Sequence, residues 1–363
     1  MSDPKHLEGV TSQFAFPGKF VSAVHWGTGH IQDSYCVEYR DGGACRRYLM
    51  QRIAGGVFKD VPALMENIER VTAYMAAQLT NVRDRERRVL TLVRARDGRL
   101  WHEDVDGENW RAYGWVEGTH TYETVETAEQ AFQAARAFGR FQAALAAMPG
   151  PRLHETIPDF HNTPKRLVAL ERAVALDDAG RAGTATREIE FALARRDLAG
   201  ALMQANLPER ITHNDTKLNN VLFDDTTGEG ICVIDLDTVM PGLAPCDFGD
   251  MVRTATSPAP EDEHDLSRVT LRLPMFEALL RGYLSAVGGV LVEAEKLLLA
   301  TAGKLITWEQ GIRFLTDYLN GDRYYKVHRE GHNLDRCRTQ FKLVELMEQR
   351  EDEMGRLVRA ALE

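Results

Sequence analysis

The stretch that decides the fold of this chain is Ile211-Thr212-His213-Asn214-Asp215-Thr216-Lys217-Leu218-Asn219-Asn220-Val221-Leu222-Phe223. Asp215 and Asn220 stand five residues apart in it, and its end is apolar. After a polar turn at residues 224–230, a second apolar run, residues 231–234, leads to Asp235. Such a turn folds two strands back on each other, so we expect Asn220 and Asp235 to lie close together.

These residue types are the ones that phosphoryl transfer from ATP requires. An aspartate must orient and deprotonate the acceptor hydroxyl, and an Asn and an Asp must hold magnesium against the phosphates. The spacing predicts Asp215 as the general base and Asn220 and Asp235 as magnesium ligands. Lys217 is expected to contact the γ-phosphate, and His213 to organise the loop. A structural His-x-Asp turn is the alternative, but it does not explain the other residues of the pattern.

A second acidic motif lies downstream. Asp247-Phe248-Gly249 has the letters of the magnesium motif of protein kinases. It lies beyond Pro241-Gly242, however, and not at the end of the hairpin strand. Asp235 is therefore the favoured magnesium ligand, with Asp237 as an additional candidate. Asp247 is expected to hold the loop through hydrogen bonds.

The composition narrows the functional class. A chain of 363 residues is long enough for two lobes that share a cleft. A formal net charge of -10 argues against a general nucleic-acid-binding protein, whose surface is basic. No signal peptide is expected at the N-terminus, and no apolar run approaches membrane-spanning length. The five cysteines are odd in number and scattered, so they are expected to be buried free thiols of a cytoplasmic protein.

The N-terminal third predicts a small sheet with a glycine-containing loop. Residues 21–26, 35–39 and 47–53 read as strands, and Gly27 and Gly29 lie between the first two. Glycines let backbone amides approach a phosphate, so both are candidate nucleotide ligands. Taken alone, the pattern fits an ordinary hairpin turn better, and the nucleotide interpretation depends on the motif downstream.

Three further residues complete the predicted nucleotide site. The third strand should carry a cation for the phosphates, and because it has no Lys, Arg52 is the candidate, with a solvated strand end as the alternative. A helix at residues 61–79 carries Glu66 and Glu69, one of which is expected to pair with that cation unless it is simply solvated. The last strand ends at Val116, in a hinge whose backbone groups are expected to meet adenine.

The predicted fold is α+β and bilobal, of the protein-kinase type. Residues 1–117 are expected to form a small N-lobe with an antiparallel sheet and a helix, which binds the nucleotide phosphates. Residues 118–363 are expected to form a larger, mostly helical C-lobe with the catalytic loop, the metal site and a sugar pocket. In this lobe a capping box at residues 127–130 opens a helix, and residues 187–205 and 335–362 are predicted to be helical.

Residues 313–325 are dense in Arg, Asp and Tyr. Sugar sites combine polar side chains that bind hydroxyls with aromatic rings that pack against the sugar ring. This segment is therefore a candidate part of the acceptor site, with a salt-bridged helix end as the alternative.

The chain resembles the aminoglycoside phosphotransferase and choline kinase superfamily through His213, Asp215, Asn220 and Ile234-Asp235. More narrowly, it is similar to the N-acetylhexosamine 1-kinases. That similarity is carried by Ile234-Asp235-Leu236-Asp237-Thr238-Val239-Met240-Pro241-Gly242, Asp247-Phe248-Gly249-Asp250, Gly29-His30-Ile31 and Arg313-Phe314-Leu315-Thr316-Asp317-Tyr318-Leu319. The resemblance spans nearly the whole chain. One departure is that the third-strand cation is not the Lys that the superfamily often shows.

The resemblance implies Asp215 as the base and Asp235 as a metal ligand, and it implies that His30, Arg313 and Tyr324 contact the sugar. It also implies an ATP- and Mg²⁺-dependent kinase that phosphorylates the anomeric hydroxyl of a hexose or N-acetylhexosamine, GlcNAc or GalNAc. The preference for N-acetylated sugars rests on the resemblance alone.

The expected partner is a small-molecule sugar, with no nucleic acid or membrane, and the chain is expected to be a monomer or homodimer. Two alternatives stay open. The first is a kinase of the same superfamily that acts on an aminoglycoside, choline, homoserine or another sugar position. The second is a pseudokinase that binds nucleotide without turnover.

Overall fold

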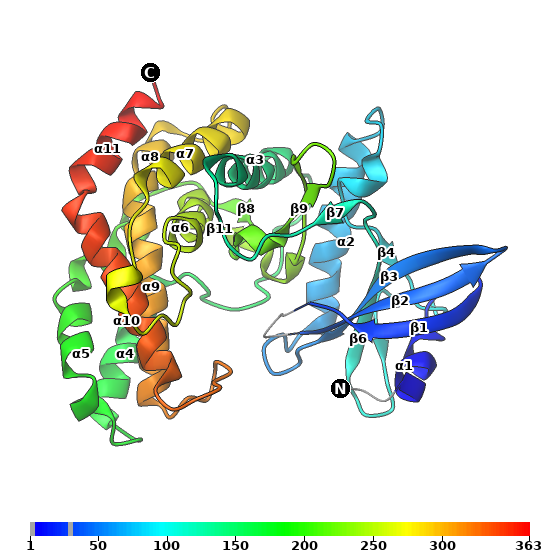
Figure 1. Ribbon diagram of the computed structural model, residues 1–363, viewed down its shortest axis with the longest axis horizontal. Helices are drawn as coiled ribbons and strands as arrows, with labels where there is room; N and C mark the ends of the chain where they lie inside the picture. Colours follow the sequence, from blue (N-terminus) through cyan, green and yellow to red (C-terminus); the bar gives the residue numbers. More distant parts are fainter. Residues whose placement is uncertain (1–3, 28–31) are drawn as a thin grey trace.

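The computed structural model describes residues 4–27 and 32–363. Its N-terminal part is built on an antiparallel sheet, which has six strands in the described residues. The order across the sheet is β1 (Lys19–His25), β2 (Asp33–Asp41), β3 (Ala44–Ile53), β6 (Asn109–Gly114) and β4 (Leu92–Val93), and β5 (His102–Glu103) pairs with β6. Figure 1 shows this sheet at one end of the molecule and most of the helices at the other.

Side chains alternate between the two faces of the sheet, as the period of a β-strand requires. Tyr39, Tyr48 and Trp110 lie on the face that is covered by α1 (Pro4–Thr11). They pack there in an aromatic cluster around the fully buried Phe14. This cluster closes one side of the sheet, so its other side is the one that faces the rest of the molecule.

That other side packs against α2 (Val61–Gln78). The Asp60 side chain caps the helix by accepting a hydrogen bond of 3.0 Å from the Ala63 amide. Leu64 and Ile68 lie on the inner stripe of α2 and are fully buried. The predicted helix of the N-terminal part is thereby confirmed.

The C-terminal part is mostly helical. α3 (Ala128–Leu145) begins with the predicted capping box of Thr127 and Gln130, and it packs side by side with α7 (Leu273–Val287) (Figure 1). The other helices are α4 (Thr163–Leu176), α5 (Thr186–Leu193), α6 (Ala244–Ala255), α8 (Glu293–Leu297), α9 (Leu299–Leu319), α10 (His332–Gln349) and α11 (Glu351–Ala360).

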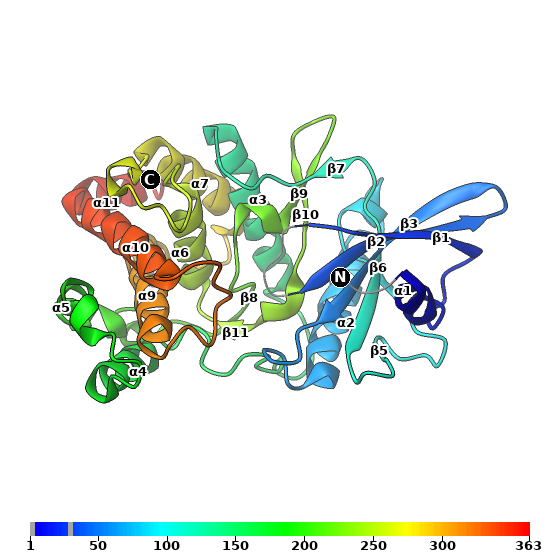
Figure 2. The ribbon, with the colours of Figure 1, turned by 60° about the horizontal axis from the view of Figure 1, so that its bottom comes forward.

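Short strands lie between the large sheet and the helices (Figure 2). β9 (Val221–Asp224) pairs with β10 (Gly230–Val233) and with β7 (Thr119–His120), and β8 (Arg210–Thr212) pairs with β11 (Met240–Gly242). The 3-10 turns are Arg85–Arg87, Ala182–Thr184, Arg196–Gly200, Met203–Ala205, Leu218–Asn220 (η5), Leu236–Thr238 (η6) and Leu266–Arg268. This central layer carries the motif that the sequence singled out.

α4 begins in a Pro-containing segment: Pro164 stands in its first turn, where proline is tolerated, and Asn162 caps it. Two helix predictions need correction. The helix predicted at residues 187–205 ends early and continues as 3-10 turns. The predicted last helix is two helices, because Arg350 leaves the helical conformation.

No helix in the described ranges combines the length and the apolar character that crossing a membrane would need. All five cysteines are free, which confirms one part of the prediction. Cys232, Cys246 and Cys337 are buried, but Cys36 is half-buried and Cys45 is exposed. Cys45 follows the hairpin turn between β2 and β3, where side chains of the short connection reach solvent.

The packing of α3 on α7 gives a test of the fold. A Cβ added at Gly282 would fall against the backbone carbonyl of Phe132, so Gly282→Ala is expected to lower the free energy of unfolding by about 1–3 kcal/mol. Gly355→Ala in α11 is the control, because its Cβ would meet only the flexible Arg359 side chain, at 3.5 Å or more. That variant is expected to be as stable as the wild type or slightly more stable. Urea unfolding of both variants decides, and equal stabilities would contradict this packing.

Candidate active site

The β9–β10 hairpin brings Asn220 and Asp235 together, as the sequence predicts. Val221 pairs with Val233 in the hairpin, and one residue further the Ile234 amide donates to the Asn220 carbonyl over 2.9 Å. Asn220 ends the loop of residues 213–220, and Asp235 begins the loop of residues 235–239. The two loops therefore meet at the open end of the hairpin.

Asp215 is the centre of the 213–220 loop. Lys217 Nζ lies 2.9 Å from its Oδ1, and Asn220 Nδ2 donates to its carbonyl over 2.8 Å and to its Oδ2 over 3.2 Å. Burial alone would raise the pKa of Asp215, but the Lys217 ammonium outweighs burial and holds that pKa below its usual value. Asp215 is therefore an ionised carboxylate, which can accept a hydrogen bond or a proton from a hydroxyl.

Asp235 differs from Asp215 in having no partner. Its φ of 58° lies in the left-handed region, and its carboxylate forms no hydrogen bond or ion pair with the described residues. A non-glycine residue pays about 1 kcal/mol or more for that conformation. Desolvation and the neighbouring carboxylates of Asp237 and Asp215 raise the pKa of Asp235 to about 7.

This arrangement fits a divalent cation. Carboxylate and amide oxygens are the ligands that Mg²⁺ prefers, and Asp235 offers an unpartnered carboxylate. Asn220 uses its Nδ2 on Asp215, so its Oδ1 is left without a donor among the described residues. A cation held here would offset the repulsion between the acids that raises the pKa of Asp235.

His213 is buried and acts on the loop, not on a substrate. Its Nε2 lies 2.9 Å from the Ile234 carbonyl, and its Nδ1 accepts the Asp215 amide over 3.3 Å. The rings of Phe138 and Phe141 pack edge-on against the imidazole. Burial lowers the pKa of His213, so the ring is neutral, which agrees with the role of a loop organiser.

Asp247 anchors the same loop from α6. Its buried carboxylate accepts the His213 amide over 3.0 Å and the Asn214 amide over 2.7 Å, and its carbonyl accepts the Thr216 hydroxyl over 2.6 Å. Both carboxylate oxygens are thus engaged by the chain itself. The structure agrees with the expectation that Asp247 holds the loop through hydrogen bonds.

Arg52 and Glu66 are not placed as the sequence suggested. Arg52 pairs with Asp33 and, over 3.6 Å, with Glu108, on the face of the sheet opposite Gln51. Glu66 and Glu69 do not pair with it: Glu66 contacts His154 over 3.0 Å and Arg70 over 3.6 Å, and Glu69 pairs with Arg94. The strand alternation turns Arg52 away from the loops, so its predicted pairing with α2 is corrected.

The cation that the sheet does present to the loops is Arg111 on β6, which the sequence did not single out. Its side chain is 1% exposed and forms an ion pair with Asp237, which is 3% exposed. Asp237 is therefore engaged by a guanidinium and does not stand free as a metal ligand. The sequence feature that could have pointed to Arg111 is an Arg inside an otherwise apolar strand. Only the register of the sheet, however, places Arg111 beside Gln51.

The other predicted nucleotide residues can be placed in part. Gly27 has a φ of 83°, a conformation that glycine adopts without strain, and a Cβ there would meet no atom within 4 Å. Gly29 and His30 lie outside the described residues. Val116 is buried, and its carbonyl accepts the Thr119 hydroxyl over 2.8 Å.

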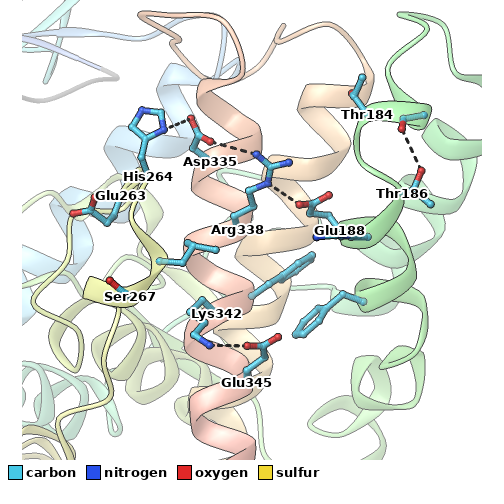
Figure 3. A pocket seen from close by; sticks show the side chains of 15 residues that line it. Thr184, Thr186, Glu188, Glu263, His264, Ser267, Asp335, Arg338, Lys342 and Glu345 are labelled. Carbon is cyan, nitrogen blue, oxygen red and sulfur yellow. Dashed lines mark hydrogen bonds and ion pairs between the residues drawn. The ribbon is translucent and has the colours of Figure 1, made fainter.

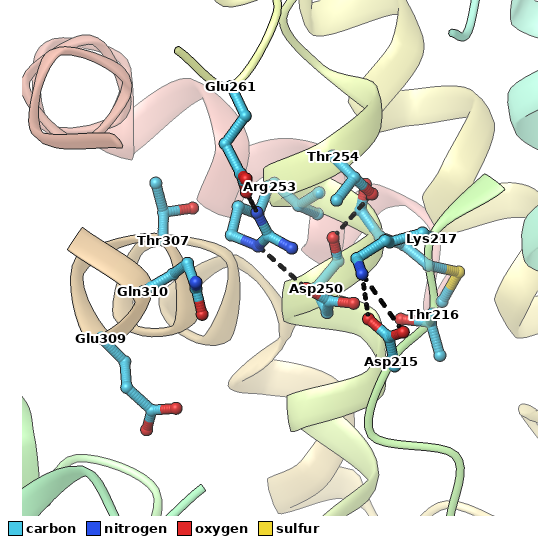
Figure 4. A network of polar contacts seen from close by, with 12 residues as sticks. Asp215, Thr216, Lys217, Asp250, Arg253, Thr254, Glu261, Thr307, Glu309 and Gln310 are labelled. Atoms are coloured by element: carbon cyan, nitrogen blue, oxygen red, sulfur yellow. Dashed lines mark hydrogen bonds and ion pairs between the residues drawn. The ribbon is translucent and has the colours of Figure 1, made fainter. Parts of the chain in front are cut away.

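A polar network extends from Asp215 toward α9 (Figure 4). Arg253 on α6 binds Asp250 over 2.9 Å and Glu261 over 2.8 Å, and Figure 4 shows this group beside the Asp215–Lys217 pair and facing α9. The Oδ2 atom of Asp250 is buried and has no hydrogen-bond partner. Buried polar atoms without partners are rare, so this network is a candidate for contacts with an acceptor molecule.

His161 joins the loop to α9. Its Nε2 lies 3.2 Å from the Asn214 carbonyl, and its Nδ1 lies 2.7 Å from the Glu309 carboxylate. Burial alone would lower the pKa of His161, but Glu309 outweighs burial and raises it. His161, Arg253 and Glu309 come from three distant segments, so no local pattern announced them as neighbours.

Arg313 and Tyr324 lie at the far side of this network. The Arg313 guanidinium is 4.9 Å from the centre of the Phe160 ring and 5.9 Å from that of Tyr325, and Tyr324 packs edge-on against Tyr325. Arg166 donates to the Phe160 carbonyl over 2.9 Å. Two of the three predicted sugar contacts, Arg313 and Tyr324, therefore lie around Tyr325, and Tyr324 is 57% exposed.

Arg166 and Arg313 share an electrostatic property. Within the described ranges, neither forms an ion pair with a carboxylate. Desolvation and the repulsion of Arg313 hold the pKa of Arg166 below its usual value. This side of the site therefore holds two guanidinium groups without a direct ion pair, and Glu309 acts on both only at longer range.

A groove of about 1050 Å³ lies elsewhere, between α5, α10 and the segment around Ser267 (Figure 3). Several of its charged side chains pair with one another. Arg338 binds Glu188 over 2.6 Å, and Lys342 binds Glu345 over 3.0 Å. None of the residues that line it belongs to the two loops, so it is not the candidate active site.

Comparisons with known proteins agree with this geometry. Spectinomycin phosphotransferase, solved in complex with AMP, is similar with a TM-score of 0.61 at 11% identity, over 96% of this chain and 99% of that one. A microcompartment-associated aminopropanol kinase gives a TM-score of 0.57 at 18% identity, over 97% of this chain and 98% of that one. Choline kinase from Cryptosporidium parvum Iowa II gives 0.56 at 12% identity, over 97% of each chain.

These similarities confirm the predicted α+β, protein-kinase-like fold. The sequence profile of the phosphotransferase enzyme family (APH) matches residues 26–286, which is more than half of the chain. The prediction of a phosphotransferase is thereby confirmed, and this chain belongs to the phosphotransferase enzyme family.

Proposed function

We propose that this phosphotransferase is an ATP- and Mg²⁺-dependent sugar kinase that phosphorylates the anomeric hydroxyl of a hexose or N-acetylhexosamine. Support for the transfer comes from the Asp215, Asn220 and Asp235 cluster. Support for the acceptor comes from the charge on the acceptor side and from the resemblance to N-acetylhexosamine 1-kinases. The transfer residues and the acceptor rest on different observations, so each has its own test below.

In the proposed reaction the sugar oxygen forms a bond to the γ-phosphorus of ATP, the bond to the β,γ-bridging oxygen breaks, and ADP leaves. Asp215 orients the hydroxyl and takes its proton. Lys217, which lies 2.9 Å from Asp215, is placed to offset charge on the transferred group. Magnesium held by Asn220 and Asp235 would neutralise charge on the phosphates. Catalysis is then mostly positioning and charge stabilisation.

The nucleotide is proposed to bind under the N-terminal sheet. Val24 in β1 is 60% exposed, and Trp26, directly after β1, is 51% exposed. The Trp26 ring packs edge-on against the Trp115 ring, with 4.9 Å between the ring centres. Exposed apolar and aromatic groups at the end of the first strand, beside Trp115, suit a planar base. The spectinomycin phosphotransferase of similar fold was solved with AMP, which supports the same use of the fold here.

The observation that carries the choice of acceptor is the unpaired positive charge at Arg166 and Arg313. Each acid of the acceptor network already has a cationic or imidazole partner: Asp250 (through Oδ1) and Glu261 pair with Arg253, and Glu309 pairs with His161. Only Asp250 Oδ2 is left to accept a hydrogen bond from an acceptor hydroxyl. A cationic acceptor such as choline or an aminoglycoside would meet guanidinium groups that repel it. A neutral polyol can accept hydrogen bonds from them through its hydroxyl oxygens.

A pseudokinase that only binds nucleotide is the second candidate. It is less well supported, because the base, the lysine and both proposed metal ligands are present and geometrically assembled. Nucleotide binding without any turnover on a broad acceptor panel would favour it.

The role of Asp215 predicts a large loss of turnover in Asp215→Asn. This variant is expected to lower kcat by about 10²–10⁴-fold, because the amide cannot take the hydroxyl proton. The affinity for MgATP should stay within about threefold, since Asp215 contributes to the transition state and not to nucleotide binding. Asp225→Asn, in the exposed turn of the hairpin, is the control and should keep wild-type turnover. Comparable kcat in Asp215→Asn would sink the assignment.

The acceptor assignment predicts activity on free sugars only. ADP release should be observed with GlcNAc, GalNAc or a free hexose and should vanish with the methyl glycosides, in which the anomeric oxygen carries no proton. Choline, homoserine and kanamycin should be inactive. Activity retained on methyl glycosides would move the reaction to another hydroxyl, and activity on choline would contradict the electrostatic argument.

The pKa of Asp235 predicts competition between protons and magnesium. Because that pKa is about 7 without metal, kcat/KM measured at low Mg²⁺ is expected to fall as the pH drops below 7. A tenfold increase in free Mg²⁺ should shift this midpoint down by about one pH unit. Asp215, whose pKa is lowered, stays ionised and does not contribute in this range. A midpoint that ignores the Mg²⁺ concentration would contradict the metal assignment.

A further inference from the structure

A buried ion pair joins the N-terminal sheet to the loop that carries Asp235. Arg111 projects from β6, and Asp237 lies in η6, two residues after Asp235. Arg111 Nη1 binds Asp237 Oδ1, and Arg111 Nη2 binds Oδ2 over 3.0 Å. The contact is bidentate and dry, with side-chain exposures of 1% and 3%. Such a geometry fixes orientation as well as distance.

Arg111 is itself held in place by two glutamines. Gln51 on β3 accepts hydrogen bonds from Arg111 Nε over 3.1 Å and from Nη2 over 2.9 Å. Gln32, at the start of the second strand, accepts from Nη2 over 3.0 Å and also donates to Asp237. Every nitrogen of the guanidinium therefore bonds to protein, and Arg111 is built into the structure as a connector and not as a free phosphate ligand.

The 235–239 loop is tied on other sides as well. The Thr156 hydroxyl donates to the Asp237 carbonyl over 2.7 Å, and the buried Asn67 of α2 donates to the Val239 carbonyl over 3.1 Å. Asp235 itself makes no such tie and sits in a left-handed conformation that its surroundings must maintain. The position of the Asp235 carboxylate thus depends on neighbouring residues, and Arg111 holds one of them, Asp237.

We propose that Arg111 is a positioning residue for metal binding: its ion pair with Asp237 docks the N-terminal sheet onto the 235–239 loop and holds Asp235 where it can bind the metal of a metal–nucleotide complex. Asp237 serves as the counter-ion of Arg111 and is not a metal ligand. This inference rests on the proposed function insofar as Asp235 is the metal ligand. The cation that contacts the loop is then Arg111 on β6, and not a residue of β3.

The test is a double-mutant cycle on metal binding. Arg111→Gln, Asp237→Asn and the double variant are compared with the wild-type full chain, with Mn²⁺ binding in the presence of ADP followed by electron paramagnetic resonance. Each single variant is expected to weaken Mn²⁺ binding about 10–100-fold, as loss of a supporting partner does at metal sites. The double variant should be no more than about threefold weaker than the worse single variant, because both remove the same link. Binding of ADP without metal should change little.

A matched control separates this effect from loss of stability. Arg210 at the start of β8 and Glu295 in α8 form another largely buried bidentate pair, with contacts of 2.6 and 2.7 Å, and neither residue belongs to the two loops. Glu295→Gln is expected to lower thermal stability as Asp237→Asn does, and to leave Mn²⁺ binding within about twofold of the wild type. Arg111→Lys keeps the charge but loses the two-point contact, and it should weaken Mn²⁺ binding several-fold even if Arg111→Gln does not fold.

The results distinguish Asp237 as the counter-ion of Arg111 from Asp237 as a metal ligand. Mn²⁺ affinity unchanged in a folded Asp237→Asn or Arg111→Lys variant would overturn the proposal. A loss in Asp237→Asn with none in the Arg111 variants would make Asp237 a metal ligand and would also overturn it, as would additive effects in the cycle. If Asp235→Asn leaves Mn²⁺ binding unchanged, the assignment of the metal site fails instead, and with it the proposed function.

Discussion

The two hydrogen bonds that the Asp247 carboxylate accepts from the His213 and Asn214 amides are the constraint on which the rest of the site depends. They fasten the loop that carries Asp215 to the first turn of α6. This helix cannot shift, because Gly249 packs against α9 so closely that a Cβ would lie 2.5 Å from the Ala302 carbonyl. The position of the proposed base is therefore set by helix packing in the C-terminal part. Asp247 belongs to a sequence motif that binds magnesium in protein kinases, but here it anchors the loop.

The site separates its acidic groups from its unpaired basic groups in a way that suits its proposed reaction. Asp215 and Asp235 gather at the end of the hairpin, where Lys217 forms an ion pair only with the first of them. Arg166 and Arg313 gather on the acceptor side without acid partners. A metal–nucleotide complex would relieve the first group, and the oxygens of a polyol would satisfy the second. The protein alone leaves both groups incomplete, which is what a site that assembles around two substrates requires.

The sequence predicted what is encoded locally. The hairpin that joins Asn220 to Asp235 follows from two apolar runs and a polar turn, and the capping box of α3 follows from two residues three apart. The positions of residues that meet only in the folded chain could not be predicted from the sequence. The strand register that puts Arg111 beside Gln51 has no local signal, and so Arg52 was chosen instead, although the alternation of the strand turns it to the other face.

Part of the acceptor side was missed for the same reason. His161, Arg253 and Glu309 become neighbours only because α6 and α9 pack together and the segment before α4 crosses the loop. Arg313 was recognised from composition and resemblance, but its lack of an acid partner is a property of the folded chain. The residues proposed to act in phosphoryl transfer lie within one short stretch of sequence, whereas those proposed to bind the acceptor come from distant segments.

The most direct test of the account is a crystal structure of the protein with Mn²⁺ and a non-hydrolysable ATP analogue, in which anomalous scattering locates the metal. The account predicts a peak in contact with Asp235 and Asn220, with the γ-phosphate directed at Asp215. A metal bound by Asp247, or a nucleotide whose γ-phosphate lies away from Asp215, would contradict it.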